Sequence, residues 1–582
     1  MDSLSKIYPF LKKHLFFIIL ILIAILPRFI LLSNVPNAIN FDELHYALDA
    51  KSFFLTGKDT FGQVAPSDIL LFHLPQSGPL QAELQYFLEI PIFGFLGFSM
   101  FNLAMPNAVM GVLAVILIYL ITIKLFDKDT AVFAGLIAAL NPWLIFLSRT
   151  TYEAGPATLF FLCVFYILLI TKGWKILLTI PFALLAFYSY IGTKLIFAPF
   201  MFLSILYAFL FINKRQFLKQ YILLFVFSCI LMFFFVSQLR LYGETSRGSE
   251  ILLPNNPAII TRVNDFRGVS LRSPLMPLLE NKYTVYGSVV IKSVFDIFSP
   301  VYLFSNADYF FLMSGHGLFY YIDLLFLIIG FMGVFFYRRK LFIFLLLYIF
   351  IGIFPQIFHK SSLDGNFTPH IALIIPFLII LIGAGISWIL KNIKNRKYSH
   401  LFLIILGFIY FILFINFCYF YFLKFPLQSG TFAAQDRILS RYIAVNDGNS
   451  PITVFSTDPR LLFKEYIFYL NAYNKRTAQA INKSLKDENY VFNNISFFPC
   501  NYNGLKDTSK MIVSEITCAK EFGGNVVNVA QLKDSGKRYI IYHDKICSQY
   551  NLPRYISNLK LSDFEIENLT PKKFCETFIV SY

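Results

Sequence analysis

Two adjacent carboxylates, Asp42 and Glu43, are the residues of this sequence best suited to general-base chemistry. They lie in the stretch NFDELHY, residues 40–46, which also supplies the imidazole of His45 and the phenol of Tyr46. A carboxylate at the edge of a cleft can accept a proton from a hydroxyl or amine acceptor. The alternative is structural, because Asp and Glu also favour the first turn of a helix.

Two short polar stretches each carry a cation between long apolar runs. Residues 148–153 read SRTTYE and residues 188–194 read YSYIGTK. Their candidate site residues are Arg149, Glu153, Tyr188, Tyr190 and Lys194. A fixed cation suits an anionic group, and a lipid phosphate is the nearest candidate. Each cation also has a structural alternative: an ion pair of Arg149 with Glu153 one helical turn on, and a snorkelling side chain for Lys194.

A long basic and aromatic segment contains two further candidates, Asp308 and His316. Its arginines are Arg240, Arg247, Arg262, Arg267 and Arg272. Such a loop could cover a ligand, or it could be a structural lid with solvated charges. Asp308 could join Asp42 and Glu43 around a divalent cation, although the sequence requires no cofactor.

Composition indicates what must position these residues. The chain is 57% hydrophobic and only 14% charged, whereas soluble domains are about 25% charged. Its net charge of +16 would suit nucleic acid. Many Lys and Arg residues instead fall in short segments between apolar runs, which is the pattern of membrane orientation. We therefore expect a membrane protein and no nucleic-acid partner.

About eleven apolar runs are long enough to be transmembrane helices. They cover residues 14–32, 104–126, 130–147, 156–171, 174–190, 194–212, 219–237, 318–337, 341–358, 371–390 and 400–423. With the N-terminus in the cytoplasm, every inside loop is basic and the short outside loops are nearly free of Lys and Arg. The sequence thus predicts a multi-pass plasma-membrane protein with the polar stretches on the outer side.

Three large pieces then lie outside the cytoplasm: outer loops 33–103 and 238–317, and the tail 424–582. In the first loop, residues 87–100 are apolar but interrupted by Pro and Gly, which predicts an interfacial segment that does not span. The tail predicts an α/β domain, with strands over 452–455, 539–542 and 577–580 and a helix over 461–471. Residues 1–423 would form the membrane domain and residues 424–582 the soluble domain.

The cysteines divide between the two predicted domains. Three lie in apolar runs, where a buried thiol is ordinary packing. Four lie in the tail: Cys500, Cys518, Cys547 and Cys575. Four cysteines in a domain outside the cytoplasm predict two disulfides, and three pairings remain open.

Other motifs argue against competing functions. There is no P-loop, and so no sign of an ATP-driven pump. Residues 127–129 read DKD, which resembles the D-x-D motif of nucleotide-sugar enzymes, but the triplet lies in a short inside turn and is interpreted as a loop. Charges within the apolar runs are scarce and no inverted repeat is visible, which weakens a transporter interpretation.

The order of these elements resembles the GT-C class of membrane glycosyltransferases. The signals are Asp-Glu after the first helix, then S-R-x-x-x-E in 148–153, then Y-x-Y-x-G-x-K in 188–194. The pattern is most similar to the branch of protein O-mannosyltransferases and the lipid A aminoarabinose transferase, which includes bacterial dolichyl-phosphate-mannose-protein mannosyltransferase-like proteins. Residues 41–62, the FSP at 298–300 and the GHGLFY at 315–320 strengthen the resemblance. It covers roughly residues 10–390 and leaves out the tail.

The resemblance implies a polytopic α-helical GT-C fold and transfer of a hexose-type sugar from a polyprenyl-phosphate donor, with inversion. The acceptor outside the cytoplasm would be protein, lipid or polysaccharide. Asp42 matches the base, with Glu43 positioning it or the acceptor, and Arg149 and Lys194 match positions near the donor phosphate. It also implies membrane-lipid partners and a bacterial cell envelope.

This chain departs from the family at two positions. Relatives carry Arg where this chain has Ala104, and Arg where it has Leu373. If those arginines hold the donor, this protein differs in donor or is impaired. Two alternatives therefore remain: a catalytically inactive GT-C-like scaffold, and a carrier or flippase of lipid-linked sugars.

Overall fold

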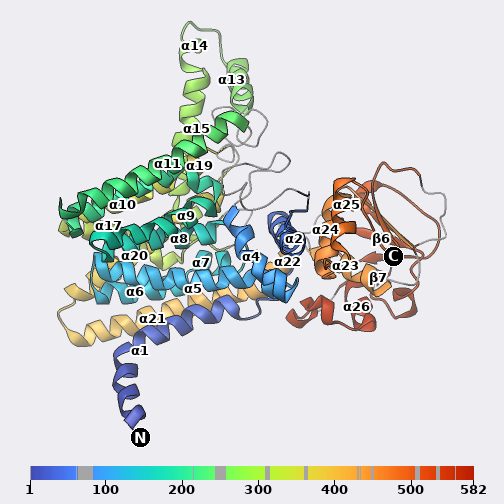
Figure 1. Ribbon diagram of the computed structural model, residues 1–582, viewed down its shortest axis with the longest axis horizontal. Helices are drawn as coiled ribbons and strands as arrows, with labels where there is room; N and C mark the ends of the chain where they lie inside the picture. Colours follow the sequence, from blue (N-terminus) through green and yellow to red (C-terminus); the bar gives the residue numbers. More distant parts are fainter. Residues whose placement is uncertain are drawn as a thin grey trace.

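The computed structural model describes residues 2–60, 62, 83–213, 215–242, 257–307, 315–359, 365–428, 432, 434–446, 451–504, 511–532, 538–556 and 559–581. It consists of a helical bundle with a sheet domain beside one end of it (Figure 1). The bundle helices before residue 243 are α1 (Asp2–Phe29), α2 (Phe41–Thr56), α4 (Glu83–Leu96), α5 (Met100–Leu125), α6 (Lys128–Leu140), α7 (Pro142–Leu147), α8 (Ala154–Ile170), α9 (Thr179–Ser189), α10 (Ile191–Ala208) and α11 (Leu218–Tyr242).

After residue 256 the chain forms two helices, α13 (Pro257–Val269) and α14 (Met276–Leu279), that project from the bundle (Figure 1), and then returns to apolar helices. These later helices are α15 (Lys282–Ile297), α16 (Pro300–Phe304), α17 (Tyr321–Tyr337), α18 (Arg339–Gly352), α19 (Phe354–Ile357), the 3-10 helix η7 (Thr368–Ile374), α20 (Ile375–Asn392), α21 (Arg396–Cys418), the π-helix η8 (Tyr419–Lys424) and α22 (Phe425–Gln428). The expected polytopic α-helical class is confirmed.

Seven helices in the described part of the chain are long and apolar enough to cross a membrane, and five further apolar helices are shorter. The predicted count of eleven therefore stays a prediction. One candidate span, Lys282–Phe304, lies in the segment that the sequence predicts to be an outer loop. There α13 and α15 pack together through the apolar side chains of Ile259, Val263, Val285 and Val289, so residues 257–304 are largely helical.

The predicted helix over 130–147 is divided in two, which corrects the sequence interpretation. Asn141 ends α6 and caps α7, because its Oδ1 accepts a hydrogen bond from the backbone N of Leu144 at 2.9 Å. Its Nδ2 donates to the carbonyl of Leu318 at 2.9 Å. Pro142 then occupies the first position of α7, where a missing N–H costs nothing. Hydropathy alone could not show this break, since both halves are apolar.

The tail folds as a seven-stranded sheet with helices α23 (Ala434–Asn446), α24 (Pro459–Tyr469), α25 (Ala478–Lys486) and α26 (Pro571–Phe578). The strand order is β2-β3-β1-β4-β6-β5-β7. β1 is parallel to β3 and β4, and the other pairs are antiparallel. The strands are β1 (Ile452–Ser456), β2 (Val491–Phe492), β3 (Ile495–Pro499), β4 (Met511–Glu515), β5 (Val526–Val529), β6 (Tyr539–Tyr542) and β7 (Ile579–Ser581).

Most of the secondary structure predicted for the tail is present. Strands β1 and β6 and helix α24 lie where the pattern placed them, but the last strand begins at Ile579 because α26 extends to Phe578. Disulfides join Cys500 to Cys518 and Cys547 to Cys575, which selects one of the three possible pairings. Helices α23 and α24 face the bundle, with α2 between them and the membrane helices (Figure 1).

Candidate functional site

The N-terminus of α2 is built on a capping box that uses Glu43. Asn40 Oδ1 accepts from the backbone N of Glu43 at 3.0 Å, and the backbone N of Asn40 donates to Glu43 Oε2 at 3.0 Å. The Asn-x-x-Glu spacing is the sequence signal for this arrangement. The other oxygen, Oε1, accepts from the backbone N of Thr151 at 2.7 Å. One carboxylate therefore fixes both the start of α2 and the stretch 148–153.

The two adjacent carboxylates have different environments. Glu43 is buried, and burial raises the pKa of its carboxyl above the ordinary 4.5. Backbone hydrogen bonds from Asn40 and Thr151 act in the opposite direction, while the charge of Asp42 adds to the increase in the pKa. Asp42 itself is exposed. Glu43 is thus held in place by its bonds, and Asp42 faces the solvent side of the same helix turn.

The third stretch, residues 188–194, lies beside the first two. The Tyr46 hydroxyl donates to Glu153 Oε1 at the start of α8. Burial raises the pKa of Tyr190, and the charges of Glu153 and Asp42 raise it further, so both carboxylates act on this phenol electrostatically. Tyr190 also stacks on the ring of His370, with centroids 6.0 Å apart. The three polar stretches, separated along the chain, therefore converge at the N-terminus of α2.

Arg149 is buried and bonds to backbone carbonyls at the end of α1. Its Nη1 donates at 2.8–3.1 Å and its Nη2 at 2.8–2.9 Å, and the acceptors are the carbonyls of Pro27, Arg28, Ile30, Leu31 and Val35. The last carbonyls of a helix have no partner inside the helix, so a guanidinium placed there satisfies them. A phosphate contact at Arg149 would have to compete with these bonds.

Lys194 is buried in the first turn of α10 among aromatic rings. Its Nζ lies 5.3 Å from the ring centroid of Phe187, 5.6 Å from that of Tyr188 and 5.7 Å from that of Phe235. Ring faces attract a cation, most strongly where water is excluded. Tyr188 therefore serves as part of the aromatic wall around this ammonium, where α9 ends and α10 begins.

The remaining predicted residues have other surroundings. His45 turns toward the tail, where its Nδ1 lies 3.1 Å from Lys464 Nζ. His316 packs against the rings of Phe417 and Phe420, at centroid distances of 5.9 and 5.0 Å. Asp308 lies outside the described residues. Among the residues that the structure describes, no group of three or more His, Cys, Asp and Glu side chains could hold a metal ion.

Two buried cations near the site were missed in the sequence. Arg28, at the end of α1, donates through Nε to Ser148 Oγ at 3.1 Å, and its other nitrogens reach carbonyls of Ala24, Ala138 and Ala139. A charged residue inside an apolar run was the signal that could have revealed it. Lys464 is a residue of α24 in the tail, and nothing in the local sequence connects it with α2.

Comparison with known proteins gives a partial family match. Residues 84–238 match the family described as dolichyl-phosphate-mannose-protein mannosyltransferase. No curated protein sequence matches the chain. Archaeal oligosaccharyltransferase AglB from Archaeoglobus fulgidus, solved with an inhibitory peptide and a dolichol-phosphate, aligns at a TM-score of 0.46 and 15% identity over 88% of this chain and 70% of that chain.

A second solved structure covers a similar part of the chain. ArnT from Cupriavidus metallidurans bound to undecaprenyl phosphate aligns at a TM-score of 0.49 and 11% identity over 91% of this chain and 98% of that chain. Both TM-scores are below 0.5, so the likeness to the family depends on the sequence match. The chain is a multi-pass membrane protein whose residues 84–238 are similar to the dolichyl-phosphate-mannose-protein mannosyltransferase family.

Proposed function

We propose that this protein transfers a hexose-type sugar from a polyprenyl-phosphate donor to an acceptor outside the cytoplasm, with inversion at the sugar. The observation that supports this most strongly is the convergence of three outer stretches on one exposed carboxylate, Asp42. A sugar phosphodiester is already activated, so the enzyme needs a base for the acceptor and a cation for the departing phosphate.

Asp42 is the proposed base. It is exposed beside Glu43, whose two oxygens are both bonded to backbone nitrogens of Asn40 and Thr151. We therefore assign Glu43 the role of a positioning residue, because its carboxylate orients the turn of α2 that carries Asp42. The acceptor hydroxyl or amine would give its proton to Asp42 as it attacks the anomeric carbon.

Lys194 is the proposed partner of the donor phosphate. A buried ammonium surrounded by ring faces gains more from an anion than one in water does. Arg149 contributes positive charge to the same end of the bundle while its nitrogens bond to the end of α1. At the two positions where relatives carry Arg, this chain has Ala104 and Leu373, both buried. The proposed role of Lys194 is correspondingly larger.

The test is transfer by the purified protein in nanodiscs with a panel of radiolabelled polyprenyl-phosphate sugars. Asp42→Asn should reduce sugar release by about 10²–10⁴-fold, the usual contribution of a positioned base. The control is Asp487→Asn, at an exposed position of the tail. Full transfer by folded Asp42→Asn would contradict the mechanism.

Two other outcomes would favour the alternative functions. Donor binding without turnover in the wild type indicates an inactive scaffold. Movement of the labelled lipid across the membrane without cleavage of its sugar–phosphate bond indicates a carrier. The acceptor class is then identified by supplying protein, lipid and polysaccharide acceptors separately to the active preparation.

A further inference from the structure

A second polar region lies at the opposite ends of α5, α17 and α20, away from α2. A pocket of about 160 Å³ opens there between the α5–α6 turn and the ends of α17 and α20. The residues of its wall that bear on the argument are Phe126, Asp127, Tyr337, Arg338, Trp388 and Lys391. The loops at this end carry the basic residues from which the cytoplasmic side was predicted.

Small residues create the space. Helices α17 and α20 approach so closely at Gly330 that a Cβ there would lie 1.9 Å from the carbonyl oxygen of Leu381. A Cβ on Gly333 would lie 3.3 Å from the ring of Trp388. Both glycines border the pocket, so neither position places a side chain in it. The tight crossing fixes the two helices, and the pocket lies beyond it toward their ends.

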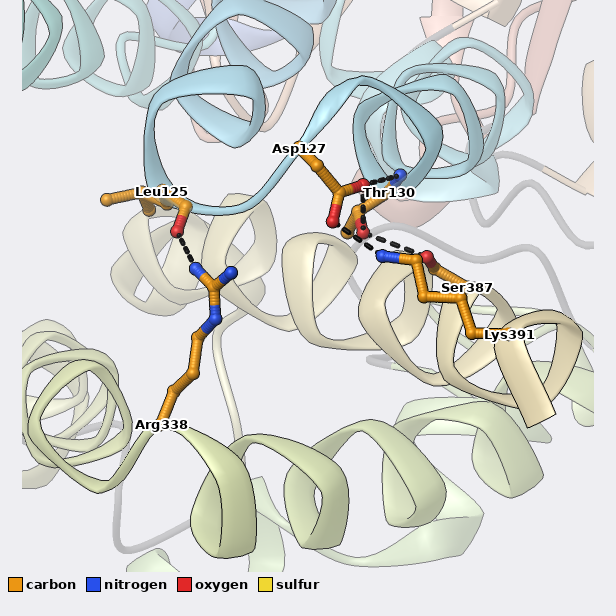
Figure 2. Close-up of polar contacts among 6 residues, drawn as sticks. All are labelled: Leu125, Asp127, Thr130, Arg338, Ser387 and Lys391. Carbon is orange, nitrogen blue, oxygen red and sulfur yellow. Dashed lines mark hydrogen bonds and ion pairs between the residues drawn. The ribbon is translucent and has the colours of Figure 1, made fainter.

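Hydrogen bonds fix the polar side of the pocket (Figure 2). Asp127 Oδ2 lies 2.6 Å from Lys391 Nζ, and Asp127 Oδ1 accepts from the backbone N of Thr130 at 2.9 Å. Thr130 Oγ1 lies 3.0 Å from Ser387 Oγ, which connects α6 to α20. These bonds place the ammonium of Lys391 at one side of the pocket.

Arg338 supplies the cation on the other side. Its Nη1 donates to the carbonyl of Leu125 at 2.8 Å, and its guanidinium lies 5.4 Å from the ring centroid of Phe126. Figure 2 shows the second terminal nitrogen turned toward the side on which Asp127 and Lys391 lie. The guanidinium is therefore anchored at one end and presents its other end to the pocket.

The charge and surroundings of the pocket suit an amphiphilic anion. Two cations face one carboxylate, and Arg339 and Lys340 follow directly along the chain. Tyr337 is 73% exposed and Trp388 is 38% exposed, so aromatic rings lie open beside the charges. Aromatic rings with Lys and Arg are typical of the membrane–water boundary, and basic pockets between helix ends bind anionic head groups.

We propose that this pocket binds the phosphate group of an anionic phospholipid, between Arg338 and Lys391. The rings of Tyr337 and Trp388 lie against the glycerol and the upper acyl chains. The volume suits a phosphate group and is too small for a nucleotide sugar. This site is separate from the transferase site, so it does not depend on the proposed function.

The test uses the position of Trp388. The chain has three tryptophans, and a Trp143→Phe/Trp174→Phe background leaves Trp388 as the only tryptophan, which is excited selectively at a wavelength that tyrosine does not absorb. In bilayers that mix phosphatidylglycerol and phosphatidylcholine, brominated phosphatidylglycerol should quench Trp388 more strongly than brominated phosphatidylcholine does. Arg338→Gln and Lys391→Gln should each reduce that preference about tenfold, the effect of losing a hydrogen bond from a charged group.

Arg339→Gln is the matched control, since Arg339 is adjacent but stacks on the ring of Phe335, 5.6 Å from its centroid. It should keep most of the preference for phosphatidylglycerol. Asp127→Asn should increase that preference, because Lys391 loses its carboxylate partner. Equal quenching by both lipids in the wild type would overturn the proposal, as would an equal loss in Arg339→Gln and Arg338→Gln.

A free anion is distinguished in the same experiment. Millimolar inorganic phosphate should leave the quenching preference unchanged if the lipid is the ligand. If phosphate abolishes the preference, the pocket takes a soluble anion and the lipid proposal fails. Circular dichroism and gel filtration of each variant show that the fold is kept, which is expected because Arg338 and Lys391 are exposed.

Discussion

The two ends of the helical bundle both gather charged side chains, but they hold them in different ways. At the end beside the tail, Glu43 and Arg149 are buried, and each bonds to backbone groups of another segment. At the opposite end, the side chains of Asp127 and Lys391 are 38% and 53% exposed. Glu43 and Arg149 are therefore part of the packed interior, whereas Asp127 and Lys391 can also contact solvent or lipid.

This difference decides what each set can do. A buried charge must have all its partners in the protein, because water is not there to replace them. Such a group fixes geometry, as a catalytic site requires. An exposed pair exchanges its partners at little cost, so it can also bind something from outside. The comparison therefore predicts large structural effects beside α2 and small ones at the opposite end.

The largest effect is expected for Arg149→Met. The substitution removes five hydrogen bonds from the guanidinium to backbone carbonyls at and just after the end of α1. Since hydrogen bonds to a charged group each contribute about 1.5–3 kcal/mol, we expect destabilisation of at least about 3 kcal/mol. Thermal unfolding in detergent measures it as a fall in the midpoint or as loss of folded protein.

The control for that prediction is Arg338→Met. Arg338 is also an arginine bonded to a carbonyl, but it is exposed and makes one such bond, to Leu125. It should change the midpoint much less than Arg149→Met does. If both variants lowered the unfolding midpoint equally, buried and exposed arginines would contribute equally to stability, contrary to the prediction.

Glu43→Gln should lower the free energy of unfolding by about 1–3 kcal/mol, because the amide NH2 would replace the oxygen that accepts a hydrogen bond from the backbone N of Asn40. Its pH dependence gives a sharper test. The pKa of Glu43 is raised by burial above 4.5 in the folded state. Its ionisation on folding is therefore disfavoured, and the stability it contributes is present below pH 4.5 and lost as the pH rises through the folded pKa.

The measurement is the difference in unfolding midpoint between wild type and Glu43→Gln across the pH range. This difference should shift in favour of the variant as the pH increases above 4.5. A shift in the opposite direction would mean that the hydrogen bonds from Asn40 and Thr151 outweigh burial, and that Glu43 is fully ionised in the fold.

Lys464 tests a buried charge outside the membrane helices. Burial lowers the pKa of its ammonium from 10.5 to about 8, against the opposing charge of Asp49. The stability it contributes is present above pH 10.5 and is lost as the pH falls through about 8. Lys464→Met should remove this dependence, with a change on the order of a few degrees in the unfolding midpoint. A wild type that matches the variant at every pH would show that Lys464 stays solvated.

Local signals in the sequence predicted much of the fold. Hydropathy located the apolar helices, and alternation located β1 and β6 in the tail. Hydropathy missed the division at Asn141, since a single amide cap and Pro142 interrupt an otherwise continuous apolar run. The disulfide pairing could not be predicted either, because it depends on how α26 folds back and places Cys575 beside Cys547.

The sequence predicted which residue types form the candidate site but not the contacts that they make. Asp42 and Glu43 stood out as residue types, and the Asn-x-x-Glu spacing at Asn40 could have predicted the cap. The partners of Arg149 could not have been found, because they are backbone carbonyls and carry no sequence signal. The contact of His45 with Lys464 joins residues 419 positions apart. Such pairs become visible only in the folded chain.

The smallest structural effect is expected for Lys391→Gln. The ion pair with Asp127 is exposed on both sides, and pairs of this kind contribute about 0–1 kcal/mol. Hydrogen bonds from Thr130 also hold Asp127 in place, so its position survives the loss of Lys391. The unfolding midpoint should therefore change little, while lipid preference falls. A large loss of stability would mean that this ion pair stabilises the fold as the hydrogen bonds of Arg149 do. The charged side chains at the two ends of the bundle would then have the same structural role.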